Sequence, residues 1–466
     1  MNEPTSNENS NATTRRDFIK RTGTLAAASA LAGTAIPYVH AAEDNTIRIA
    51  VVGCGGRGSG AAVDALTVGG AVKVYALADV FEEKPKQTFA SLKNSFADKV
   101  DVAPERLFTG FDAYQHAMDS LRPGDVVILA TPLAFRWVHF TYAIAKGLNV
   151  FMEKPLTADG PTSKRMLKLA EDAAAKNLKV GVGLMSRHSR ALQELHKRIE
   201  DGEIGDIILM RGYRMHGPVG FFSSLPKPAG ISELMYQIQR FHSFLWASGG
   251  NFSDFYIHHI DHLCWMKNAW PVKAQALGGR HYRQSPDGQT YIDQNFDNYS
   301  VEYTFEDGSK MLFDGRCMSG CADIYSSYVH GSKGLAIASK QNDCGLPSST
   351  YKGQNPNRKS QLWESKVAAE DQNPYHNEWK DLLAAIRNNE TYNEVKRGVE
   401  ASLVTSMGRM AAHTGQQITY DEMLNSPHEF APGLDKLTAD SPAPLQLAAN
   451  GRYPIPQPGL VTEREY

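Results

Sequence analysis

The fold is decided by residues 47–58, which read IRIAVVGCGGRG. The first six are a short, nearly continuous apolar run, as expected of a strand buried on both faces of a sheet. The last six match the pattern G-x-G-x-x-G, in which glycines allow a tight turn, backbone approach to a diphosphate and close helix–strand packing. Because a helix-compatible segment follows at residues 59–66, the stretch predicts a dinucleotide site at a helix N-terminus. The expected contacts are Gly53, Gly55, Gly56, Arg57 and Gly58.

A second apolar run, residues 72–79, ends in Asp79. This acid comes about twenty residues after the glycines, where a carboxylate binds the ribose hydroxyls of the cofactor. A carboxylate repels a 2′-phosphate, so the sequence favours NAD over NADP, although Lys84 and Lys86 lie nearby. The alternative is that Asp79 is a turn or cap residue.

Apolar runs then alternate with helix-compatible segments, the runs being residues 125–132, 148–152 and 179–184. This alternation predicts an α/β fold with a doubly wound parallel sheet, a Rossmann domain over residues 46–185. Such a sheet binds ligands at the carboxyl ends of its strands. Further cofactor contacts are therefore expected at Thr131, Pro132, Glu153 and Lys154. For Lys154 the alternative is an ordinary surface lysine.

Beyond residue 185 the pattern changes to strands without alternating helices, at residues 207–215, 272–277, 299–305 and 310–316. Their period of two predicts a C-terminal α+β domain, residues 186–420, with an open-faced, mostly antiparallel sheet. Its free face is a candidate subunit contact. Residues 342–357 suggest a loop, and residues 421–466 an extended tail laid over a neighbouring subunit.

A helix beginning near Ser253, capped by Asn251 or Ser253, is the informative element of this second domain. Polar residues recur on one stripe of it at i, i+4, i+7 and i+8, namely Asp254, His258, Asp261 and His262. A solvated face more often carries Lys and Glu. A metal site is the alternative, but we expect none, because nucleotide chemistry already accounts for Lys154 and the stripe.

The first 41 residues carry Arg15-Arg16, a weakly apolar run and Val39-His40-Ala41. This order predicts a twin-arginine export signal and a periplasmic protein; the alternative is a disordered tail. The run is too short for a permanent membrane helix. A net charge of −2 gives no reason to expect a nucleic-acid partner. With five cysteines at least one is unpaired, and Cys317 and Cys321 pair only if the backbone turns between them.

The ordered set of motifs resembles the glucose-fructose oxidoreductase / inositol dehydrogenase / MocA (Gfo/Idh/MocA) family over roughly residues 46–415. The motifs are the export signal, the glycine loop, Ala130-Thr131-Pro132, Glu153-Lys154-Pro155, and Gly249-Gly250 followed by Asp254 and His258. The resemblance implies a homodimer or homotetramer, pyridine-nucleotide chemistry on a sugar or polyol, and a cis peptide before Pro155. It also implies that Lys154 lies near the nicotinamide, that Asp254 binds substrate and that His258 transfers a proton.

These roles suit the oxidation of an alcohol, since His is matched to neutral pH as a base and a lysine ammonium stabilises an alkoxide. For His258 the alternative is a satisfied core histidine. Arg187, Arg240 and His242 are weaker candidates for substrate contacts. The predicted function is an NAD-dependent sugar or polyol oxidoreductase with a tightly bound cofactor. The alternatives are an NAD-dependent glycoside hydrolase, which works by transient oxidation and elimination, and a non-catalytic sugar-binding protein.

Overall fold

The computed structural model describes residues 45–466, so the predicted export signal at residues 1–41 lies outside the described residues. The first sheet has six strands in the order β3-β2-β1-β4-β5-β6, and its neighbouring strands pair in parallel. This is the strand order of a doubly wound dinucleotide-binding sheet, as predicted. The strands are β1 (Ile47–Val52), β2 (Val72–Asp79), β3 (Leu107–Thr109), β4 (Val126–Leu129), β5 (Asn149–Met152) and β6 (Val180–Val182).

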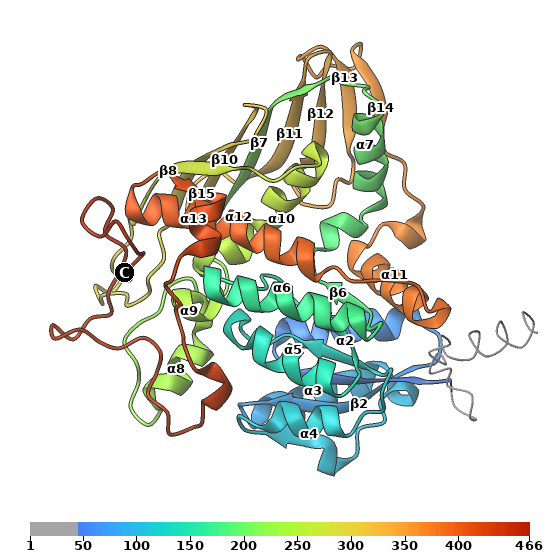
Figure 1. The fold of residues 1–466 in the computed structure, drawn as a ribbon, viewed down its shortest axis with the longest axis vertical. Coiled ribbons are helices and arrows are strands. Elements are labelled where there is room, and N and C mark those ends of the chain that lie inside the picture. Colours follow the sequence, from blue (N-terminus) through green and yellow to red (C-terminus); the bar gives the residue numbers. More distant parts are fainter. Residues whose placement is uncertain (1–44) are drawn as a thin grey trace, which may run out of the picture. The chain divides into compact units, whose positions relative to one another are not determined.

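Helices cover this sheet, and Figure 1 shows them in blue to green in the lower part of the view. They are α2 (Gly56–Val68), α3 (Glu83–Ser95), α4 (Ala113–Asp119), α5 (Arg136–Ala145) and α6 (Gly160–Ala175). Strands β4 and β5 are buried along their whole length, which explains why their sequences are continuous apolar runs. Helix α2 begins inside the glycine loop, three residues before the predicted start at 59.

The second sheet has nine strands in the order β14-β13-β12-β11-β7-β10-β9-β8-β15. Strands β7 and β10 pair in parallel, and the remaining neighbours pair antiparallel, so the predicted mostly antiparallel sheet is confirmed. The strands are β7 (Ile207–His216), β8 (Lys273–Gly279), β9 (Asn298–Thr304), β10 (Lys310–Cys317), β11 (Ile324–Gly331), β12 (Gly334–Lys340), β13 (Ser349–Lys352), β14 (Gln361–Glu364) and β15 (Ile418–Thr419). The prediction of a loop over 342–357 is wrong in part, because Ser349–Lys352 adds a strand to this sheet.

Two long helices pack on one face of the nine-stranded sheet, α10 (Gly250–Lys267) and α12 (Val395–Thr414). Helix α12 also packs against α6, and Figure 1 shows it running between the two sheets. In β9 the residues under the helices, such as Tyr299 and Val301, are buried, whereas Ser300 is exposed. The other helices of this part are α7 (Arg190–Glu200), α8 (Glu233–Gln239), α9 (Leu245–Ser248), α11 (Pro374–Asn388) and α13 (Tyr420–Asn425).

Helix α10 begins earlier than predicted, and its cap is not Asn251 or Ser253. Gly249 occupies the cap position without a side-chain hydrogen bond, and the backbone is left-handed at Gly249 (φ 72°) and at Gly250 (φ 71°). Glycine tolerates this conformation, so the chain turns sharply into the helix. Ser253 therefore lies within the first turns, and its hydroxyl is free for another partner.

The tail that follows α13 packs on its own chain rather than extending away from it. Phe430, Leu445 and Tyr453 are buried in one apolar cluster with Phe244 and Trp246. All five cysteines are free, so Cys317 and Cys321 do not form a bridge. Within residues 45–466 no helix is both long and apolar enough to cross a membrane.

Candidate active site

A cavity of about 1260 Å³ lies along the carboxyl ends of β1, β2, β4 and β5 and continues to α10 and the second sheet. All the expected cofactor contacts except Gly58 line this cavity. They are Gly53, Gly55, Gly56, Arg57, Asp79, Thr131, Pro132, Glu153 and Lys154. The lining also includes Asp254, His258 and His242. The volume exceeds the roughly 300–1,000 Å³ of common small-molecule pockets, so a dinucleotide and a small substrate have room together.

The glycine loop has the geometry that a diphosphate-binding loop requires. Gly53 has φ 95°, and a Cβ atom there would lie 2.7 Å from the carbonyl carbon of Ala130. A Cβ on Gly58 would lie 1.9 Å from the carbonyl oxygen of Gly53, so only glycine allows α2 to pack this closely on the loop. A Cβ on Gly55 or Gly56 would have no atom of the described chain within 4 Å, and both residues line the cavity. These residues therefore fit a bound dinucleotide.

Asp79 ends β2 at the wall of the cavity. Its carboxylate accepts hydrogen bonds from the backbone N–H of Cys54 (2.7 Å) and of Phe81 (3.0 Å). Burial raises the pKa of Asp79, and these N–H groups and Lys84 act in the opposite direction. The backbone thus fixes the carboxylate at the position where the sequence predicts a ribose contact.

Arg57 is held beside the glycine loop by acidic and aromatic side chains. Its Nε donates to Glu153 Oε1, and its guanidinium lies 4.6 Å from the centre of the Tyr375 ring. Glu378, which is wholly buried on α11, lies 3.7 Å from Arg57 Nη2. Burial and the neighbouring Glu153 raise the pKa of Glu378 well above its ordinary value. Arg57 is therefore tied to the strand end that carries Lys154.

Lys154 follows β5, and the peptide bond between Lys154 and Pro155 is cis, as the resemblance implies. Lys154 Nζ donates to the backbone oxygen of Asp254 (2.7 Å) and lies 3.3 Å from its carboxylate Oδ1. His242 Nε2 lies 3.1 Å from the other oxygen, Oδ2. Burial alone would raise the pKa of Asp254, but Lys154 and His242 outweigh it and hold this pKa far below its ordinary value. Asp254 is thus ionised, and its two carboxylate oxygens contact Lys154 and His242.

His258 lies one turn after Asp254 and lines the same cavity. Burial lowers the pKa of His258 to about 3, and Lys154 adds to this effect. The imidazole is therefore neutral at pH 7. Its Nδ1 has no hydrogen-bond partner among residues 45–466. A neutral imidazole in a cavity is able to accept a proton from a bound hydroxyl group, but a pKa of about 3 makes His258 a weaker base than the near-neutral histidine expected from the sequence.

A second polar group in the cavity was not predicted from the sequence. The Tyr325 hydroxyl donates to Asp343 Oδ2 (2.5 Å), and Arg214 Nη1 lies 3.7 Å from the same oxygen. Arg214 and Tyr325 are cross-strand partners on β7 and β11, and Asp343 follows β12. No local motif marks these residues; only the pairing of the strands brings them together.

Several predicted residues do not reach the cavity in the described chain. Arg187 Nε and Nη2 donate to the two carboxylate oxygens of Asp261, at 2.9 and 2.7 Å. Arg240 Nε donates to Ser224 Oγ (2.9 Å), and its guanidinium lies over the Phe221 ring. His262 Nε2 lies 2.6 Å from Ser327 Oγ. The stripe on α10 is therefore divided: Asp254 and His258 face the cavity, whereas Asp261 and His262 have partners within the domain.

Comparison with known proteins identifies the class of the first domain. Residues 47–184 match the Gfo/Idh/MocA family model, which is described as an oxidoreductase family with an NAD-binding Rossmann fold. These residues therefore form an NAD-binding Rossmann domain of the Gfo/Idh/MocA type.

Among curated proteins the chain is similar to inositol dehydrogenases. An inositol 2-dehydrogenase of Corynebacterium glutamicum (strain R) is 32% identical over 96 residues, which are 21% of this chain and 28% of that protein. An inositol 2-dehydrogenase/D-chiro-inositol 3-dehydrogenase of Halalkalibacterium halodurans is 29% identical over 177 residues, 38% of this chain and 46% of that protein. The chain thus spans less than half the length of these two relatives.

The likeness in fold extends over both domains. A myo-inositol 2-dehydrogenase from Lactobacillus plantarum has a TM-score of 0.57 and 20% identity, covering 80% of this chain and 99% of that one. A levoglucosan dehydrogenase in complex with NADH and levoglucosan has a TM-score of 0.62 and 15% identity, covering 81% of this chain and 100% of that one. The two-domain α/β fold is therefore that of solved dehydrogenases.

Proposed function

We propose that this protein is an NAD-dependent oxidoreductase that acts on the CH–OH group of a sugar or polyol. One observation carries the proposal: a single cavity runs from the glycine loop to Lys154, Asp254 and His258. The similarity to inositol dehydrogenases supports a polyol or sugar as the substrate class. Phe241 and Phe255 flank His242 in the same cavity, as suits the apolar face of a sugar ring.

When bound, NAD supplies the hydride acceptor. The residues of the chain then have to remove the hydroxyl proton and stabilise the oxygen that loses it. Neutral His258 accepts the proton, and the Lys154 ammonium stabilises the negative charge that develops on the oxygen. Asp254 keeps Lys154 in place through its backbone oxygen and its carboxylate. Because Asp254 stays ionised, the Lys154 ammonium is balanced before substrate binds.

The proposal includes NAD rather than NADP as the cofactor, because the Asp79 carboxylate is fixed at the cavity wall. It also includes export by the twin-arginine route to the periplasm, and assembly as a homodimer or homotetramer. Export of the folded protein favours a cofactor that stays bound, since that compartment has no free nicotinamide pool. Extraction of the purified protein is then expected to yield NAD(H) without added cofactor, and an extract without it would contradict this part.

A redox-assisted glycoside hydrolase is the second candidate, and the Tyr325–Asp343 pair favours it. A glycosidic leaving group needs a proton donor. The Tyr325 hydroxyl carries a proton, which it donates to Asp343 Oδ2 in a hydrogen bond of 2.5 Å. The cavity then holds one group that accepts a proton, His258, and one that is able to donate a proton, Tyr325.

Mixing the purified protein with free sugars, inositols and aryl glycosides distinguishes these functions. The absorbance of the bound cofactor and the released aglycone are followed together. A lasting rise in NADH absorbance with a free sugar or polyol supports the oxidoreductase. Continuous aglycone release without net change in the cofactor supports the hydrolase. If neither occurs in protein that binds NAD, or if Lys154→Met and His258→Asn react as fast as the wild type, the enzymatic roles proposed for these residues are wrong.

A further inference from the structure

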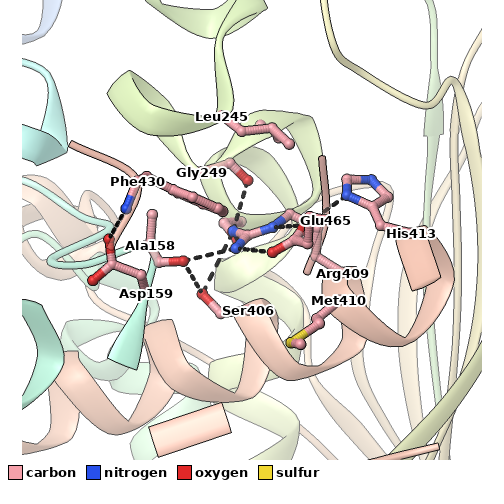
Figure 2. A network of polar contacts seen from close by, with 12 residues as sticks. Ala158, Asp159, Leu245, Gly249, Ser406, Arg409, Met410, His413, Phe430 and Glu465 are labelled. Atoms are coloured by element: carbon pink, nitrogen blue, oxygen red, sulfur yellow. Dashed lines mark hydrogen bonds and ion pairs between the residues drawn. The ribbon is translucent and has the colours of Figure 1, made fainter. Parts of the chain in front are cut away.

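Arg409 on α12 is a wholly buried arginine that does not line the cavity in the described chain. Its Nη1 donates to the backbone oxygen of Gly249 (2.9 Å) and to Ser253 Oγ (2.7 Å). Its Nη2 donates to the backbone oxygen of Ala158 (2.7 Å). Figure 2 shows Arg409 at the centre of this network, between the Ala158 segment, Gly249 and Glu465.

The partners of Arg409 belong to the two segments that carry the cavity residues. Ala158 lies four residues after Lys154, in the segment that follows the cis peptide bond. Ser253 directly precedes Asp254, and Gly249 caps the helix on which both lie. One planar guanidinium thus binds both backbones behind the Lys154–Asp254 contact. An arginine presents its donors in a rigid fork, so it fixes the spacing of its partners better than a flexible ammonium does.

Glu465 balances the charge of Arg409. Its carboxylate accepts from Arg409 Nε (2.9 Å) and Nη2 (2.8 Å), and it lies 2.6 Å from His413 Nδ1. The side chains of Arg409 and Glu465 are 0% and 3% exposed, so neither charge is solvated by bulk water. A buried arginine that loses its carboxylate is left uncompensated, which is strongly unfavourable. The position of Arg409 therefore depends on Glu465.

The tail supports the same segment at a second place. The backbone N–H of Phe430 donates to Asp159 Oδ2 (3.1 Å), and the Phe430 ring centre lies 5.4 Å from the Arg409 guanidinium carbon. Asp159 directly follows Ala158 and caps α6 through the N–H of Thr162. The segment after Lys154 is thus held from one side by Arg409 and from the other by the tail.

We infer that Arg409, with its charge balanced by Glu465, is a positioning residue that fixes the separation of Lys154 and Asp254. It acts on the site through the backbone at Ala158 and the first turn of α10, without touching the cavity. The kinetic part of this inference rests on the proposed function; the structural part does not. A misplacement of about 1 Å costs roughly 10²-fold in rate, so a small relaxation of this network is measurable.

The test compares Glu465→Gln with Asp125→Asn. Asp125 is also a wholly buried carboxylate bonded to an arginine, Arg122, but it lies at the amino end of β4, away from the cavity. Both changes remove one buried negative charge at constant shape. The first readout is the NMR signal of Lys154 in protein labelled with ¹³Cε-lysine, assigned as the signal lost in Lys154→Arg. The second is kcat and KM with the reacting sugar or polyol.

Glu465→Gln is expected to shift the Lys154 signal and to lower kcat about 10- to 100-fold. Asp125→Asn is expected to lower thermal stability and leave the Lys154 signal and kcat unchanged. Folded Glu465→Gln protein whose Lys154 signal and kcat match those of Asp125→Asn would overturn the inference. If Glu465→Gln does not fold, Ser253→Ala takes its place, because it removes one hydrogen bond to Arg409. An unchanged Lys154 signal in Ser253→Ala would then overturn the inference. If the wild type oxidises no sugar, the proposed function fails, while the NMR comparison still decides the positioning role.

Discussion

Replacing Gly55 by alanine tests whether the glycine loop binds the diphosphate of NAD. Gly55 has φ −79° and ψ −172°, which alanine adopts without strain, and no atom of the described chain lies within 4 Å of the added Cβ. The free energy of unfolding without cofactor is therefore expected to change by less than about 0.5 kcal/mol. The methyl group would project into the cavity, where the backbone has to approach the cofactor.

Loss of one hydrogen bond to a charged phosphate costs about 1.5–3 kcal/mol. Since 1.4 kcal/mol is about tenfold in affinity, the Kd of NADH is expected to rise about 10- to 100-fold. NADH fluorescence titration of cofactor-stripped protein measures this, with thermal unfolding in parallel. The control is Gly217→Ala, where no atom lies within 4 Å of the Cβ and the position lies outside the cavity lining of the described chain. Wild-type affinity in Gly55→Ala would refute the assignment of this loop.

Three further predictions concern charged and titratable groups in and near the site. Asp79→Asn is expected to improve NADPH binding relative to NADH at least about tenfold, because juxtaposed like charges cost several kcal/mol; an unchanged ratio of the two Kd values would contradict it. Lys154→Met and His258→Asn are each expected to lower kcat by about 10²–10⁴ with little change in the Kd of NADH, as stopped-flow and titration will show. Burial lowers the pKa of His139 and His258 to about 3 and that of His262 to about 4. Between about pH 4 and pH 6.5 these groups therefore bind protons in the unfolded chain but not in the folded one. Stability should therefore fall as the pH drops from about 6.5 towards 4, by up to about 1.4 kcal/mol per pH unit for each histidine, and His262→Gln should flatten the pH dependence of the urea midpoint.

Features set by neighbouring residues in the chain could be predicted from the sequence. The glycine loop requires glycines for local reasons, since a Cβ at Gly58 would meet the Gly53 carbonyl. Asp254 and His258 share a helix stripe because they are four residues apart. The alternation of strands and helices likewise predicts the parallel sheet, since each strand and helix is recognisable from its own residues.

Features that depend on distant parts of the chain could not. Tyr325, Asp343 and Arg214 meet only because β7 and β11 are neighbours in a nine-stranded sheet. Arginine is a residue type that often contacts substrates, but the guanidinium of Arg187 is bound by Asp261. The cap of α10 was misplaced because Ser253 serves Arg409, a partner more than 150 residues away along the chain, as their separation of 156 shows. In each case the choice of partner is decided by tertiary packing.

Hydride transfer between substrate and bound cofactor is the step that defines the proposed reaction, and transfer of an isotope label measures it. The sugar or polyol that reacts best is deuterated at the carbon that bears the reacting hydroxyl and mixed with protein carrying NAD. After a single turnover the nicotinamide is extracted and its mass is determined. The nicotinamide of the wild type is expected to carry deuterium, and that of Lys154→Met, stopped after the same reaction time, is expected to carry at least about a hundredfold less. Product formation without deuterium in the nicotinamide would contradict it.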